Sequence, residues 1–210
     1  MLVAIGCNGF AGEATVKAPA AEKASSMTAL DQARAALNRR GSGGMVGDIS
    51  LAGYSFSHEL EIGGGLHVIV ISSNLAGGLA VFRSDGSAVT TQPTREITWV
   101  QLFDLDEDGV SEVVTEEIDG RGTGVLEKTF RVYRVTTNNV AEIWSGQSFR
   151  RHAPDENHIE ESNAFLRFDR SGGGRNARLT HLIVDASRHP SEAVYEWRDG
   201  GLHRMSRPLQ

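Results

Sequence analysis

The chain has 210 residues, a formal net charge of −6, 40% hydrophobic residues and 23% charged residues. This length allows one sizeable domain with a full core, or one domain plus a tail, and the composition excludes a chain that is disordered throughout. The acidic balance argues against nucleic acid or an anionic membrane surface as a partner, because both select for an excess of Lys and Arg. The single cysteine, Cys7, excludes a disulfide within the chain, and the sequence predicts no transmembrane helix because it has no long apolar run.

Residues 1–26 are predicted to form a tether. Residues 1–7, Met-Leu-Val-Ala-Ile-Gly-Cys, resemble the end of a bacterial lipoprotein signal, in which small and aliphatic residues precede a lipidated cysteine. The resemblance implies lipidation at Cys7; the alternative is a short apolar N-terminus with an incidental cysteine. Residues 8–26 are rich in Ala, Gly and Ser without periodicity, which is typical of a spacer.

Residues 27–44 predict a short helix followed by a flexible joint. Thr28 and Asp31 are spaced as a capping box, and Leu30, Ala33 and Leu37 fall on one helical stripe. We expect a helix from about 27 to 40, packed against the edge of the following domain. The glycines of residues 41–44 end the helix and form the joint.

Residues 45–210 predict an all-β domain built from repeats. Three aromatic strands, marked by Phe82, Tyr133 and Tyr195, lie 51 and 62 residues apart, and each leads into an Asp-Gly or Asn-Asn turn signal. Two more apolar segments precede each of these strands; they are residues 54–60 and 66–72, 97–103 and 112–117, and 164–168 and 179–185. We therefore predict about three four-stranded antiparallel units of a propeller-like kind.

The most specific motif lies in the middle unit, between two predicted strands. It reads Phe-Asp-Leu-Asp-Glu-Asp-Gly-Val-Ser-Glu-Val-Val from Phe103 to Val114. Alternating carboxylates followed by a glycine allow a short loop to turn its oxygens around one hard cation. The predicted Ca²⁺ ligands are the side chains of Asp104, Asp106, Asp108 and Glu112 and the carbonyl of Val110. The alternative is a solvated acidic turn.

This motif resembles the FG-GAP or VCBS repeat shared by integrin α-subunit propellers and many bacterial surface proteins. The resemblance covers roughly residues 50–206 and implies a calcium-binding β-repeat domain outside the cytoplasm. Only the middle unit predicts a site, because the equivalent segments at residues 61–66 and 169–175 each keep one carboxylate. Residues 104–119 hold eight acids and no base, and a divalent cation would relieve their repulsion.

Three other features carry weaker predictions. Residues 145–162 are expected to form a long polar loop that either contacts a partner or has no particular role. Trp99, Trp144 and Trp197 occupy similar-looking strand positions and predict either core packing or a platform for glycans. Glu116 and Glu117 are predicted to point to opposite faces of a strand and to belong to an acidic rim.

The sequence holds no recurrent catalytic motif, so the first hypothesis is a non-enzymatic one. It is a calcium-binding protein of the cell envelope or a secreted protein, which binds an unidentified protein or glycan or acts as a scaffold. The alternative is a calcium-stabilised envelope hydrolase acting on glycans or peptides. A third candidate is a structural subunit of an envelope complex. Localisation in the envelope, through a lipid at Cys7, is expected over the cytoplasm.

Overall fold

The chain folds into two antiparallel sheets and one helix in the computed structural model, which describes residues 28–41, 56–74, 76–155, 158–170, 177–185 and 190–205. The helix is α1 (Ala29–Gly41). The strands are β1 (Phe56–Gly63), β2 (Leu66–Ser73), β3 (Ala76–Arg83), β4 (Ala88–Thr94), β5 (Glu96–Phe103), β6 (Glu112–Gly122), β7 (Val125–Val135), β8 (Val140–Asp155), β9 (His158–Arg170), β10 (Ala177–Val184), β11 (Pro190–Arg198) and β12 (Gly201–Arg204). The predicted all-β class with one short helix is confirmed. None of the described residues belongs to a helix that is both long enough and apolar enough to cross a membrane.

Local turn chemistry explains why neighbouring strands pair in sequence order. Gly86 and Gly200 adopt φ values of +82°, and Asp199 adopts +51°, so the two Asp-Gly signals sit in hairpin turns. In the turn between β7 and β8, the Thr136 hydroxyl accepts hydrogen bonds from the backbone N–H of Asn139 and Asn138. These turns join β3 to β4, β7 to β8 and β11 to β12, as the sequence predicts.

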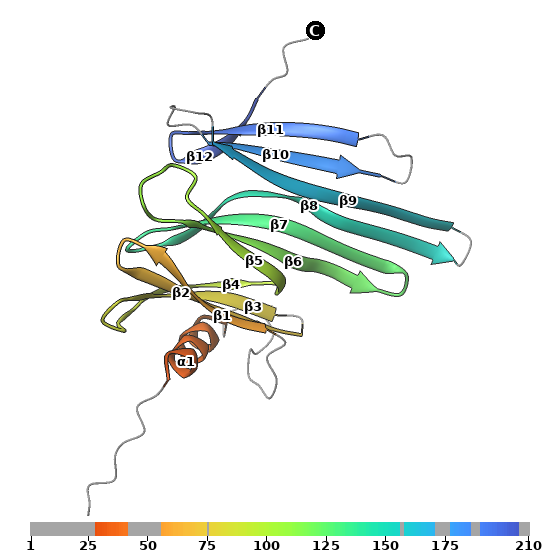
Figure 1. Cartoon of the computed structure of the whole chain (residues 1–210). Coiled ribbons are helices and arrows are strands. Elements are labelled where there is room, and N and C mark those ends of the chain that lie inside the picture. The colour runs from red at the N-terminus through yellow and green to blue at the C-terminus, as the bar shows by residue number, and fades with distance from the viewer. Residues whose placement is uncertain are drawn as a thin grey trace, which may run out of the picture.

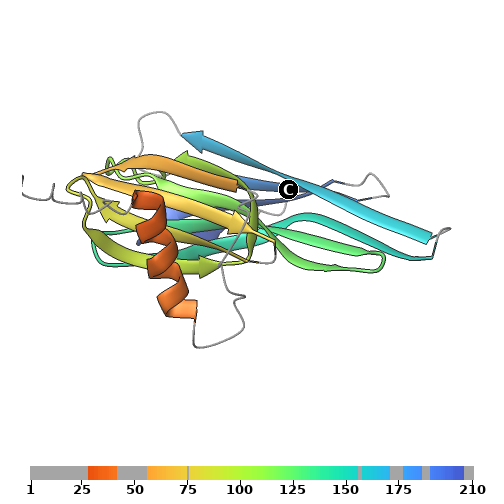
Figure 2. The same ribbon diagram turned by 90° about the horizontal axis from the view of Figure 1, so that it is seen from below.

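The strands divide into a four-stranded sheet, β1–β4, and an eight-stranded sheet, β5–β12. The first predicted unit is therefore a separate sheet, whereas the second and third are joined. They are joined because β8 pairs with β9 from Phe149 opposite Asn163 to Asp155 opposite His158. The prediction of a long loop over residues 145–162 is wrong, because its described residues lie in β8 and β9, and the paired ends of these strands extend beyond the rest of the molecule in Figure 2.

The eight-stranded sheet opens at the base of that hairpin. β8 pairs with β7 from Val140 to His152, and β9 pairs with β10 from Asn163 to Arg170, but β8 and β9 pair with each other only from Phe149 opposite Asn163 outward. The halves β5–β8 and β9–β12 then pack face to face, since Phe103 of β5 stacks on Phe168 of β9 at 4.3 Å between ring centroids. Figure 1 shows the resulting order of layers: α1, β1–β4, β5–β8 and β9–β12.

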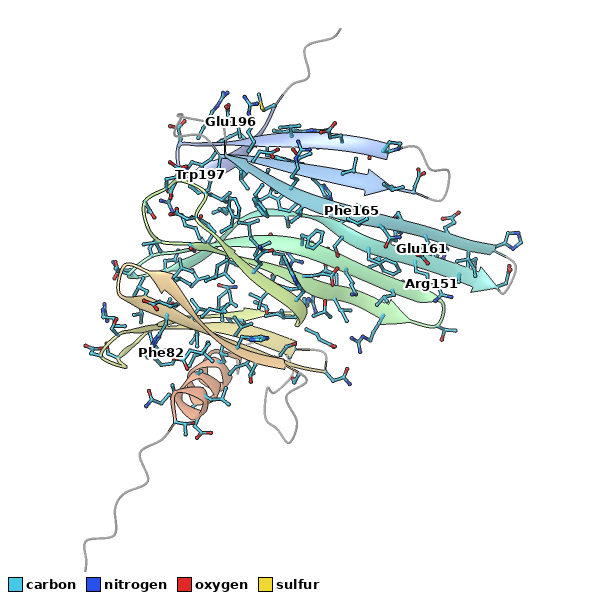
Figure 3. All side chains as sticks on the ribbon, in the orientation of Figure 1. Phe82, Arg151, Glu161, Phe165, Glu196 and Trp197 are labelled. Carbon is cyan, nitrogen blue, oxygen red and sulfur yellow. The ribbon has the colours of Figure 1, made fainter. Side chains whose placement is uncertain are left out.

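Three hydrophobic clusters hold these layers together. The strands form three groups of four, β1–β4, β5–β8 and β9–β12, and the third strand of each group contributes an equivalent aromatic residue. Phe82 of β3 packs in the cluster between α1 and the first sheet, and Figure 3 shows it above the helix. Tyr133 of β7 packs between the first sheet and β5–β8, and Tyr195 of β11 packs between the two halves of the large sheet. Each aromatic thus faces the preceding layer, which indicates that the three groups are stacked in the same sense.

The helix packs on the outer face of the first sheet, at one end of the stack of layers (Figure 1). Its cap forms as expected, because Thr28 Oγ1 accepts from the Asp31 N–H at 3.2 Å. Ala33 and Leu37 are fully buried against β2 and β3. Gly78 permits this close approach, since a Cβ at that position would lie 2.5 Å from a methyl group of Leu37.

Candidate functional site

The acidic motif forms a loop between β5 and β6, where the sequence predicts it. Asp104, Asp106 and Asp108 each place one carboxylate oxygen so that the three atoms lie within 4.8 Å of one another. Gly109 adopts a φ of +86°, and Glu107 adopts +58°, so the backbone turns sharply enough to gather the three side chains. Oxygen ligands at this spacing can in principle hold one metal ion.

The loop's own hydrogen bonds leave two carboxylate oxygens available. Asp104 Oδ2 accepts from the Gly109 N–H at 3.2 Å, and Asp108 Oδ1 accepts from the Val110 N–H at 2.8 Å. The other oxygen of Asp104, Oδ1, and Oδ1 of Asp106 are buried without a hydrogen-bond partner. Leaving a buried acceptor unsatisfied is unfavourable, and a cation bound by these oxygens would remove that cost.

Glu112 lies beside the three aspartates but outside their group of ligand atoms. Its side chain is 2% exposed, and its Oε2 accepts from the Leu105 N–H at 2.8 Å. Burial raises the pKa of Glu112 to about 7, and the charge of Asp106 adds to this effect. Glu112 therefore braces the start of the loop, and its role as a ligand, like that of the Val110 carbonyl, stays a prediction.

Basic residues of β7 reach the acidic segment from a distant part of the sequence. Arg134 Nη2 lies 2.9 Å from Asp106 Oδ2 and 3.9 Å from Asp108 Oδ2, and its guanidinium also lies over the ring of Trp197. Burial nevertheless raises the pKa of Asp106, and the Asp108 charge acts in the same direction. The segment itself contains no base, but the fold brings an arginine from β7 to one side of the loop.

The loop also joins the two sheets. Ser111 N–H donates to the Ile62 carbonyl at 2.7 Å, and Val110 forms an isolated antiparallel bridge with Gly63. Gly63 is the last residue of β1, next to the turn that is equivalent to the acidic loop in the first group of strands, and a Cβ there would lie 1.9 Å from the Gly109 carbonyl oxygen. The position of the acidic loop is thus tied to the packing of the first sheet on the second.

Two predicted acidic-rim residues have different environments. Glu116 and Glu117 point to opposite faces, as expected, but Glu117 is only 1% exposed and is not part of a rim. It accepts hydrogen bonds from the hydroxyls of Tyr133 and Thr115, both at 2.8 Å, and Arg131 Nε lies 3.3 Å away. Burial raises the pKa of Glu117. This arrangement is a buried polar network between the sheets.

The three tryptophans are not equivalent, contrary to the sequence-based expectation. They lie on β5, β8 and β11, which are first, fourth and third strands of their groups. Trp144 and Trp197 are core residues, whereas Trp99 is 39% exposed. Trp99 lines a groove that sequence reasoning missed, and the alternation of Trp99, Gln101 and Phe103 along one face of β5 is the signal that could have indicated it.

Some predicted features lie outside the described residues. They are Cys7 and the tether of residues 1–26, the joint after Gly41, and most of the segment 169–175 that corresponds to the acidic loop in the third group. Within the described ranges, the three aspartates form the one acidic or histidine-containing group arranged to hold an ion. No family model, curated protein or solved structure matches this chain, so the resemblance to FG-GAP or VCBS repeats stays a prediction.

Proposed function

We propose that the protein binds one Ca²⁺ in the β5–β6 loop and serves as a binding or scaffold protein of the cell envelope or the extracellular space. The observation that carries the metal site is the pair of buried, unpartnered oxygens on Asp104 and Asp106 beside Asp108. Each of these two residues uses its second oxygen within the protein, on Gly109 and Arg134, so a cation can be bound without loss of the loop's own bonds.

The ion would have a structural role. The loop touches the first sheet through Ser111 and Val110 and approaches the third group through Arg134 and Trp197. A cation that orders the loop would therefore stabilise contacts among all three groups of strands. Calcium fits such a loop better than magnesium, because it accepts irregular oxygen geometry and carbonyl ligands, whereas Mg²⁺ demands an octahedral shell.

The stacking of three similar four-stranded groups supports the hypothesis that they are propeller-like units, arranged as an open stack. One end of the stack is covered by α1. The outer face at the other end carries ion pairs, Arg178 and Arg198 with Glu196, and Arg167 with Asp169. Figure 3 shows Glu196 on the side of β11 away from Trp197. Phe165, which is 58% exposed, lies on the same face of β9 as Arg167 and Asp169, but the ion pairs make this face more polar than the faces buried between the groups. A repeat array needs such a polar face at its last unit, so we propose a finished stack of three and not a closed ring.

Thermal unfolding of the full chain after EDTA treatment tests the metal site. If Ca²⁺ binds with a Kd near 10 μM, then about 1 mM Ca²⁺ stabilises the folded state by about 2.7 kcal/mol, and Tm rises by about 5–11 °C. We expect Asp104→Asn to abolish most of this rise and Asp169→Asn, in the third group, to leave it intact. Magnesium serves as the control ion. An equal rise in both variants would refute the single-site proposal.

The binding or scaffold role and the envelope location are proposals that rest on the sequence resemblances, Cys7 included. Mass spectrometry of the protein expressed with its native N-terminus in a bacterium would detect a lipid on Cys7. The alternative of a calcium-stabilised hydrolase predicts turnover of envelope glycans or peptides, which a substrate screen would reveal. Co-purification after mild crosslinking would separate a ligand-binding protein from a structural subunit.

A further inference from the structure

A groove of about 610 Å³ opens where the two halves of the eight-stranded sheet part. Its floor is one face of the first half, in which Trp99, Glu116 and Phe130 lie opposite one another across β5, β6 and β7. Gln101 and Phe103 continue this floor along β5. Its wall is a stretch of β9, residues 164–168.

The wall is an edge of a strand and not a sheet face. Consecutive residues of a strand point to opposite faces, so five consecutive residues can line one groove only along the strand's edge. Over residues 164–169, the described part of the chain pairs β9 with β10 alone, because the β8–β9 ladder ends at Asn163. The backbone N–H and C=O groups on the side away from β10 are thus available to another strand.

The floor beneath this edge is aromatic and partly exposed. Trp99 is 39% exposed and meets Phe130 edge-on, with 6.2 Å between ring centroids. Phe103 and Phe168, which stack in the contact between the halves, also line the groove, so the groove continues that internal apolar contact. Phe165, on the β9 side in Figure 3, is 58% exposed. An occupant would therefore need apolar groups directed at the floor.

The charges of the groove are already paired within the protein. Glu116 Oε2 lies 2.9 Å from Lys128 Nζ, and Arg167 Nε lies 2.7 Å from Asp169 Oδ2. The lining thus offers no unpaired charge to a strongly acidic or basic ligand. A free strand edge above an apolar floor matches an uncharged, extended polypeptide, which has both the backbone groups and the alternating side chains.

We propose that the groove binds an extended, uncharged peptide segment of a partner protein. The segment adds to β9 as a strand where β8 leaves the sheet, and it directs alternate apolar side chains onto Trp99, Phe103 and Phe130. This inference rests on the proposed binding role, to which it adds the class of partner and the location of the site. It does not require the metal ion.

The test uses the full chain and fluorescein-labelled peptides of eight residues with blocked ends, in which Val, Ile or Phe alternates with Thr or Ser. Fluorescence anisotropy measures their affinity. Two matched sets carry backbone N-methyl groups at odd or at even positions, which removes the N–H groups on one side of the bound strand. We expect at least one peptide to bind and one of its methylated forms to lose at least about tenfold in affinity.

Variants locate the site independently. Trp99→Ala, at a part-exposed position, should weaken the same peptide by about tenfold or more. Ile159→Ala is the control, because Ile159 is also a large, exposed apolar residue, at 52% exposure, and lies on β9, the strand of the groove's wall, but does not line the groove. Circular dichroism and Tm confirm that both variants fold. The control should bind as the unchanged protein does.

Four results would overturn the proposal. The first is that no peptide binds at about 1 mM, and the second is that the unmodified peptide and both of its methylated forms bind with equal affinity. The third is that Trp99→Ala binds the peptide as tightly as the unchanged protein does, and the fourth is that the protein binds hexasaccharides from a panel but no peptide. The calcium shift is measured on the same protein. Peptide binding without that shift would reject the metal site alone, and a calcium shift without peptide binding would reject the groove alone.

Discussion

Replacing Gly63 by alanine should destabilise the protein by separating the acidic loop from the first sheet. Gly63 has a φ of +92°, and an added Cβ would lie 1.9 Å from the Gly109 carbonyl oxygen. The atoms that the added Cβ would meet belong to the backbone of Gly109 and Val110, so no side-chain rotation relieves the clash. The loop must move away, and the hydrogen bond from Ser111 to Ile62 and the packing of Val110 are lost with it.

The magnitude follows from these three contributions. Placing an alanine in the left-handed region costs about 1–2 kcal/mol, the lost hydrogen bond about 1 kcal/mol, and the exposure of Val110 about 1–2 kcal/mol. We therefore expect the free energy of unfolding to fall by about 3–5 kcal/mol. For a domain of this size, Tm should fall by about 6–20 °C.

Gly86→Ala is the matched control, and both variants are measured by thermal and urea unfolding. Gly86 has a φ of +82°, but a Cβ there would have no atom within 4 Å, so the control carries the backbone strain without the clash. We expect it to lose only about 1–2 kcal/mol. If Gly63→Ala were no less stable than Gly86→Ala, the loop would not be held against the first sheet as described.

Three further substitutions test other parts of the fold. Gly78→Ala should lower the free energy of unfolding by about 1–3 kcal/mol, because the added methyl group displaces Leu37 of α1. In the double variant with Leu37→Ala this clash is gone, so the two losses measured by urea unfolding should be less than additive. Leu179→Ala should cost about 2–5 kcal/mol, because Leu179 is fully buried between the halves of the large sheet, and a loss below about 1 kcal/mol would contradict that packing. Burial lowers the pKa of His181 below its ordinary value of 6.5, so the folded state binds fewer protons than the unfolded chain just below pH 6.5, and stability should fall as the pH drops through 6.5 towards the folded pKa. Urea unfolding between pH 7.5 and pH 5 should show a smaller loss of stability for His181→Gln than for the unchanged protein. Equal losses would show that His181 does not contribute to the pH dependence of stability.

The turns and the acidic loop could be predicted because their determinants are local. Asp85-Gly86 and Asp199-Gly200 tolerate the positive φ of a hairpin turn wherever they occur, and adjacent strands then pair without long-range information. The alternating carboxylates before Gly109 likewise converge through the conformation of a few neighbouring residues. The helix cap at Thr28 and Asp31 belongs to the same category.

The partners of these local elements could not be predicted in the same way. Residues 145–155 and 158–162 lie in β8 and β9 and carry many exposed polar side chains, and polar composition alone does not distinguish such strands from a loop. Arg134 comes 28 residues after Asp106, and only the antiparallel return of β7 brings the two together. Glu117 is likewise buried because the first sheet covers its face of β6.

The sequence by itself determined the all-β class, the turn positions, the helix and the three-carboxylate loop, since each depends on backbone preferences within a few residues. The tertiary structure alone decided that the second and third groups share one sheet, that the acidic loop rests on Gly63, and that residues 164–168 of β9 line an aromatic groove. These features arise from contacts between residues that are far apart in the chain. Such contacts depend on which faces are buried together, and an alternating strand pattern shows that a face is buried without specifying its partner.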